Sequence, residues 1–407
     1  MRHGPSTRSG RLFLLSLEGW RALGGLIAFV LAAKTFGLKG YGMLISAYAI
    51  AAIALPLIGQ GTVDLAVRSG ATGTAAAHLK RSLRHVLPIS PVVAAIAGVG
   101  FTSLRGLDAG LLVALIVLAE TGPAYAIAIC SAVCLGSKDL RRAATRGGLP
   151  LLIRVASLAL LSPTHPTAEV WAAVNLGVVS VVSLVVARRT MRWTSLEAKT
   201  ELGAWRDSSF GVNDSLLTVS NNADTLLLGF LQSAESAGLY GAQYRLAQYC
   251  LIPTRALLTA NLSLLYHAGN LSERWRLART CAFRSFIATS AVALVAGCLG
   301  PFIRVLGSGF RFDLRVYALL AIGFSLRGIS FSFGDVWTVE GKQRVRTKLQ
   351  SAATVLTVVL YVALILPFGP IGAAAATVLG EVIFISLMSA TRTSLKELHH
   401  DAGAQVG

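Results

Sequence analysis

Long runs of apolar residues, separated by short basic segments, constrain what this chain can fold into more than any other feature. A helix needs about 20 predominantly apolar residues to cross the hydrocarbon core of a bilayer. Twelve runs of the sequence come near or exceed that length, and they leave about 13 residues for each tail or loop. The runs are continuous rather than alternating, which favours helices over a β-barrel. The sequence therefore predicts an all-α, polytopic membrane protein with about twelve transmembrane helices and no soluble domain.

The predicted spans form two groups of six, because the longest polar connection, residues 188–207, divides the chain near its middle. The spans of the first group are 12–33, 41–66, 86–104, 109–135, 149–162 and 170–187. The spans of the second group are 210–231, 238–266, 285–303, 316–337, 349–366 and 371–390. This division predicts an N-terminal six-helix lobe, residues 1–195, and a C-terminal six-helix lobe, residues 196–407, related as in parallel-repeat transporters.

The fifth predicted span is the shortest. Pro163 follows Leu149 after about 14 residues, which is below the usual spanning length, and Arg154 interrupts the run. A re-entrant or tilted segment is therefore an alternative to a full crossing. The charge distribution favours the crossing, since omitting this span would invert the orientation of every later loop.

The orientation follows from the basic residues, because cytoplasmic loops are enriched in Lys and Arg. Most of the 37 basic residues lie in the two tails and in alternate loops. The opposite loops hold only six, namely Lys34, Lys39, Arg105, Arg304, Arg311 and Arg315. Both termini are therefore predicted to be cytoplasmic, in a multi-pass protein of the cell inner membrane that faces anionic lipid on its basic side.

Composition excludes several classes of protein. Charged residues make up 14% of the chain, against about 25% in soluble domains. The basic excess is spread over many loops instead of one patch, so nucleic acid is not an expected partner. The five cysteines have no spacing typical of a zinc site, and no nucleotide-binding GxxxxGK[ST] sequence occurs. We therefore expect no metal, no cofactor and no catalytic residues.

Three stretches resemble a known family. Residues 34–43 (KTFGLKGYGM), followed by Gly-Gln-Gly at 59–61, are similar to its "LG..eyG" motif before the second helix. Residues 222–229 (NADTLLLG) and 237–246 (AGLYGAQYRL) resemble its "D..llg … vG.Y..a.rl" crossing from the seventh to the eighth helix. Residues 369–378 (GPIGAAAATV) resemble its "G..GaA.at" start of the last helix. These are motifs of Wzx-type polysaccharide biosynthesis flippases, within the multidrug/oligosaccharidyl-lipid/polysaccharide exporter (MOP) superfamily.

The resemblance implies a two-lobed carrier of twelve helices around a central cavity. It implies alternating access that moves an undecaprenyl-diphosphate-linked oligosaccharide across the cytoplasmic membrane, for O-antigen or exopolysaccharide export. The implied partners are this lipid-linked oligosaccharide, membrane lipids, and polysaccharide polymerase or export proteins.

Charged groups inside the spans are the candidate site residues, since each costs about 2.5–3.5 kcal/mol to insert. All basic residues placed inside spans are arginines, whose planar fork suits bidentate phosphate contacts. Polar residues of the seventh span, 210–231, recur with helical spacing, which predicts that one face of this helix lines a water-filled cavity. The predicted cavity residues are Arg21, Arg154, Arg245, Arg255, Asn221 and Asn222. Arg245 and Arg255 are expected at two depths on one helix.

Asp224 and Glu120 are the predicted ion-coupling residues, since an ion-driven cycle requires an embedded carboxylate. Structural ion pairs, such as Asp224 with Arg245, are the alternative for these charges. Four other acidic residues lie near predicted span ends and are expected to reach water: Asp64, Asp214, Asp335 and Glu381.

Two other functions compete with the flippase. A multidrug or cation antiporter of the same superfamily would favour an acidic cavity, and five intramembrane arginines argue against it. A membrane-embedded glycosyltransferase or polymerase would need catalytic carboxylates on a large outer loop. The predicted outer loops contain only four acidic residues, Asp108, Glu169, Glu235 and Asp313, and no loop holds more than one of them, so the chain is not expected to be an enzyme.

Overall fold

We describe the protein from a computed structural model. The structure describes residues 7–59, 61–137, 139–195, 208–307 and 309–391. This part of the chain is helical and contains no strand. Eight of its helices are long and apolar enough to cross a membrane. The prediction of an all-α polytopic membrane protein is therefore confirmed.

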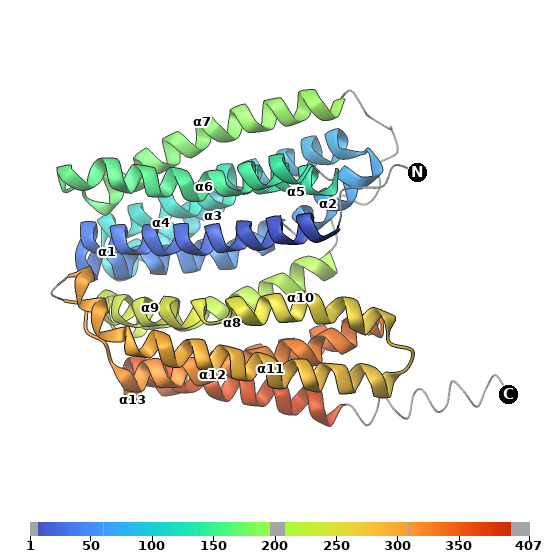
Figure 1. The fold of residues 1–407 in the computed structure, drawn as a ribbon. Coiled ribbons are helices and arrows are strands. Elements are labelled where there is room, and N and C mark those ends of the chain that lie inside the picture. Colours follow the sequence, from blue (N-terminus) through green and yellow to red (C-terminus); the bar gives the residue numbers. More distant parts are fainter. Residues whose placement is uncertain (1–6, 60, 138, 196–207, 308, 392–407) are drawn as a thin grey trace. The chain divides into compact units, whose positions relative to one another are not determined.

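The chain forms two compact units (Figure 1). Unit 1 comprises Met1–Gly238 and Leu306–Phe310, and unit 2 comprises Leu239–Val305 and Arg311–Gly407. The boundary predicted between the two lobes borders residues 196–207, which lie outside the described residues.

The elements before residue 232 all belong to unit 1. They are α1 (Thr7–Gly59), α2 (Thr62–Thr72), α3 (Ala75–Arg105), α4 (Leu107–Ala119), the π-helical turn η1 (Glu120–Ala124), α5 (Tyr125–Gly136), α6 (Leu140–Leu161), η2 (Ser162–Thr164), α7 (Ala168–Ser195) and α8 (Ser208–Leu231). The later elements lie in unit 2, apart from the first residues of α9 and the last of η3. They are α9 (Ala234–Tyr249), α10 (Ile252–His267), α11 (Leu271–Cys298), η3 (Gly300–Leu306), α12 (Leu314–Val339) and α13 (Gln343–Ala390).

Helix α1 is a hairpin of two helices. Gly37 has φ 64° and ψ −174°, a conformation that glycine adopts without a Cβ penalty. The ring centroids of Phe29 and Tyr41 lie 5.3 Å apart. Twelve residues of uninterrupted helix would separate these side chains by about 18 Å. The chain therefore folds back at Gly37, and α1 supplies two passes.

Helix α13 folds back in the same way at Gly369, which has φ 55° and ψ −131°. The hydroxyl groups of Tyr361 and Thr377 lie 3.1 Å apart, although sixteen residues of straight helix span about 24 Å. Because α1 and α13 each fold back, the eight candidate spans of the described residues supply ten passes. Helix α8 and the pair α9 and α10 lie where the remaining two passes are predicted.

The eighth pass is interrupted, contrary to the prediction of one helix carrying Arg245 and Arg255. Helix α9 ends at Tyr249 and α10 begins at Ile252. Pro253 has no N–H to donate to the carbonyl of Tyr249, so the regular ladder breaks there. Arg245 therefore lies on α9 and Arg255 on α10, and the two arginines do not share one continuous helix.

The fifth pass is longer than the apolar run indicated. Helix α6 has 22 residues, which is enough to cross a bilayer. It begins nine residues before Leu149, and the side chain of Asp139 accepts a hydrogen bond from the backbone N–H of Arg142 at its N-terminus. Polar residues of the first turns had hidden this part of the helix from a hydropathy count.

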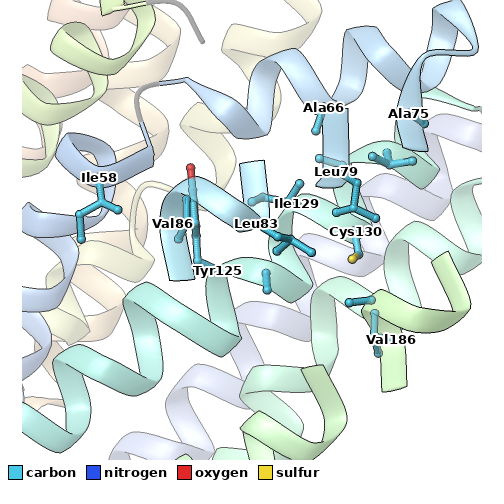
Figure 2. Packing of buried hydrophobic residues seen from close by; sticks show 14 residues of the cluster. Ile58, Ala66, Ala75, Leu79, Leu83, Val86, Tyr125, Ile129, Cys130 and Val186 are labelled. Atoms are coloured by element: carbon cyan, nitrogen blue, oxygen red, sulfur yellow. The ribbon is translucent and has the colours of Figure 1, made fainter. Parts of the chain in front are cut away.

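The core of unit 1 contains a cluster of apolar side chains from α1, α2, α3, α5 and α7 (Figure 2). Leu79 and Ile129 are fully buried in it. Tyr125 lies at its edge, and its hydroxyl group is 2.9 Å from the Thr62 hydroxyl. Burying the aromatic ring while satisfying its hydroxyl group fixes the start of α2 against α5.

Glycine permits a close helix approach at Gly42, in the second half of α1. A Cβ at this position would overlap the carbonyl oxygen of Ala234, whereas a Cβ at Gly177 on α7 would meet no atom within 4 Å. Gly42→Ala is expected to destabilise the protein by about 1–3 kcal/mol through overpacking. Gly177→Ala, the matched control, is expected to leave stability unchanged or to raise it. Thermal unfolding of the purified proteins in detergent checks both, and a Gly42→Ala protein as stable as the wild type would contradict the expectation.

Candidate functional site

An ion pair inside unit 1 joins two of the predicted site residues. Arg154 lies on α6, and Glu120 opens the π-helical turn between α4 and α5. The Nη2 atom of Arg154 donates to Oε1 of Glu120 over 2.6 Å. The sequence had assigned these residues separate roles, in cargo binding and ion coupling, and the structure brings them together.

The π-helical turn that carries Glu120 has a local cause. Pro123 cannot donate a backbone hydrogen bond, and its ring would clash with the carbonyl group four residues earlier. A wider turn accommodates it, and such turns occur frequently at functional sites. The Thr121 hydroxyl donates to the carbonyl oxygen of Val117 over 2.7 Å, which satisfies a backbone acceptor near the turn. Pro123 thereby alters the helix register at the position of Glu120.

Tyr48 completes the cluster from the second half of α1. The guanidinium carbon of Arg154 lies 4.2 Å from the centroid of the Tyr48 ring, within the range of a cation–π interaction. The side chains of Arg154 and Glu120 remain 23% and 24% exposed. Within the described part of the chain, the buried Nε atom of Arg154 has no hydrogen-bond partner. The guanidinium group is thus held in place while one of its donors is unused.

The surroundings of the pair combine apolar side chains with one polar bridge. Ala119 and Ile153, which adjoin Glu120 and Arg154 in sequence, belong to an apolar cluster that also contains Val179 of α7. The indole Nε1 of Trp171 donates to the Ser157 hydroxyl over 2.9 Å, and that hydroxyl donates to the carbonyl oxygen of Arg154 over 3.1 Å. An apolar setting strengthens the electrostatic interactions of an arginine, and the bridge fixes α6 against α7. This arrangement can bind an anion.

Unit 2 contains a second buried ion pair. Nε of Arg327 donates to Oε1 of Glu381 over 2.6 Å, and the two side chains are only 6% and 10% exposed. The hydroxyl group of Ser330 donates to the other carboxylate oxygen over 2.7 Å. The expectation that Glu381 reaches water was therefore wrong, because a partner inside the protein holds it. The sequence showed Arg327 as an intramembrane charge but did not identify this pair.

The other predicted site residues lie elsewhere. Arg245, on α9, is partly buried and donates to Oε1 of Gln248 over 3.2 Å, whereas Arg255 on α10 is exposed. Arg21 lies on α1, and its side chain is outside the described residues.

The polar residues of α8 are more enclosed. Asn221 and Asn222 are partly buried, and the Asn222 amide donates to the carbonyl oxygen of Thr218 over 2.8 Å. Asp224 is 1% exposed, and its Oδ1 accepts from the backbone N–H of Thr225 over 2.6 Å. The roles of these residues in binding or coupling stay predictions.

Comparison of the sequence with protein-family models finds no match, and neither does comparison with curated proteins. Solved structures of similar fold include transporters. A MOP superfamily transporter from Pyrococcus furiosus has a TM-score of 0.56 and 15% identity, with 96% of this chain and 95% of that chain covered. An outward-facing multidrug resistance transporter of the MATE family has a TM-score of 0.58 and 17% identity, with 96% of both chains covered. The lipid II flippase MurJ has a TM-score of 0.59 and 13% identity, with 92% of this chain and 86% of that chain covered.

These likenesses extend over nearly the whole chain, so they concern its complete fold and not one part of it. The protein has the fold of MOP superfamily transporters.

Proposed function

We propose that the protein is a flippase for lipid-linked oligosaccharides. It moves an undecaprenyl-diphosphate-linked precursor across the cytoplasmic membrane by alternating access, between two six-helix halves and with both termini in the cytoplasm. The observation that carries the proposal is Arg154, a partly exposed arginine in a transmembrane helix with an unused donor. Arginine binds diphosphate oxygens through a planar set of donors that lysine lacks.

The comparisons support the same class of cargo without identifying it. One protein of this fold is a lipid II flippase. In another, the MOP superfamily transporter from Pyrococcus furiosus, reverse polarity of the binding pocket suggests a different function. In this chain, the arginines placed inside the spans favour an anionic cargo.

A multidrug or cation antiporter is the second candidate. Multidrug transporters of the MATE family share the fold, and Asp224 is a buried carboxylate. Expression in a drug-sensitive strain distinguishes the two candidates, since an antiporter would export cationic dyes and a flippase would not.

A deletion strain supplied with this chain tests the flippase proposal. Lipid-linked oligosaccharide should accumulate on the inner leaflet without the protein and be cleared with it. Arg245→Ala and Arg255→Ala are each expected to slow clearance without loss of protein from the membrane, because each removes a cation from the proposed cargo path. Normal clearance by both variants would contradict the role of these two arginines. A complemented strain that still accumulates the precursor would contradict the flippase itself.

A further inference from the structure

The carboxylate of Glu120 occupies the place on Arg154 that an anionic ligand would take. We propose that Glu120 is an internal counter-anion, displaced by cargo, that restricts the Arg154 site to multivalent anions. This inference rests on the proposed function and names the selectivity of the same site.

The contact between Arg154 and Glu120 does not use all the hydrogen-bond donors of the arginine. Arg154 contacts Glu120 through Nη2 alone, although a guanidinium group carries five N–H donors. Its Nε is buried with no partner in the described structure, and the Tyr48 ring packs against the guanidinium group. An anion with several oxygens can engage donors that the single Glu120 contact leaves unused.

The carboxylate of Glu120 is also free to move away. Within the described residues it accepts a hydrogen bond from Arg154 only, through one of its oxygens. Glu381 in unit 2 is bonded through both oxygens, to Arg327 and Ser330, and is less exposed. The same two residue types therefore form a displaceable pair in unit 1 and a fixed pair in unit 2.

Charge then decides which anions displace Glu120. A monovalent anion on Arg154 replaces one negative charge with another and leaves Glu120 unpaired nearby, in surroundings where an uncompensated charge is costly. A diphosphate brings more acceptor oxygens as well as more charge, so it forms contacts with Arg154 donors that Glu120 leaves unused, and these added contacts offset that cost. When no cargo is bound, the pair is neutral, and a neutral site is cheaper to keep inside the membrane than a lone arginine.

Titration calorimetry of the purified protein in detergent tests the proposal with inorganic pyrophosphate and inorganic phosphate as probes, at mildly acidic pH, where phosphate is mainly a monoanion and pyrophosphate carries at least two charges. Glu120→Gln keeps the size of the side chain and removes its charge. It is expected to raise the affinity for phosphate at least tenfold and to reduce the preference for pyrophosphate over phosphate. Arg154→Gln is expected to abolish binding of both probes, in the presence or absence of Glu120→Gln.

Glu169→Gln is the matched control, since it removes the same charge from another helix of unit 1. It should leave both affinities unchanged. Unchanged or weaker phosphate binding by Glu120→Gln would overturn the counter-anion, even in a protein that clears oligosaccharide normally. Tighter binding by Glu120→Gln, in a protein that fails to clear oligosaccharide, would support the counter-anion and contradict the proposed function.

Discussion

Arg154→Leu is expected to lower clearance of lipid-linked oligosaccharide by about 30-fold or more, since truncating one partner of a buried charged contact costs about 2–5 kcal/mol. Two changes combine in this variant. The cargo loses its donors, and Glu120 loses its hydrogen-bond partner in partly buried, apolar surroundings. The initial rate of precursor clearance in the complemented deletion strain, normalised to protein in the membrane, measures the effect.

Arg154→Lys separates charge from geometry. Lysine keeps a positive charge that can pair with Glu120 but lacks the planar fork of donors. We expect an intermediate rate, closer to that of Arg154→Leu. A lysine variant with the wild-type rate would show that charge alone suffices and that bidentate contact has no role. A leucine variant with the wild-type rate would remove Arg154 from the cargo site altogether.

Breaking the Arg327–Glu381 pair is expected to have the largest effect on stability. Arg327→Met leaves Glu381 buried, with the Ser330 hydroxyl group as its remaining hydrogen-bond donor among the described residues. Removing one partner of a buried ion pair typically costs about 3–5 kcal/mol. Thermal unfolding of the purified variant in detergent should therefore show a large fall in midpoint.

The double variant Arg327→Met with Glu381→Leu provides the control. Apolar replacement of both partners is often neutral or stabilising, because neither charge is then left unpaired. The double variant is expected to recover most of the lost stability. If it is no more stable than Arg327→Met alone, the loss comes from side-chain shape and not from the unpaired charge.

The sequence predicted the number and order of the passes because hydrophobic length is a local property, and the bilayer imposes it on every span. It did not predict where helices begin or break. Polar residues extend α6 well before Leu149, and the missing donor of Pro253 divides α9 from α10. Such boundaries depend on backbone hydrogen bonds more than on hydropathy.

The candidate site was predicted only in part, for a related reason. A charge within a span is visible in the sequence, so Arg154 and Glu120 were both identified. Their pairing depends on how α6 meets the π-helical turn, 34 residues earlier in the chain, and no spacing rule encodes that contact. Glu381 was misjudged because its depth was estimated from the nearest span end, whereas its partner Arg327 lies on another helix.

The turns at Gly37 and Gly369 also concern how the protein is made. Each joins two apolar helices through a single non-helical residue, without a hydrophilic loop between them. The two helices of each hairpin are adjacent in sequence, so they emerge from the ribosome one directly after the other. The turn between them can therefore form during synthesis. Each hairpin is therefore expected to enter the membrane as one preassembled pair, which makes these two turns poor places for an epitope tag.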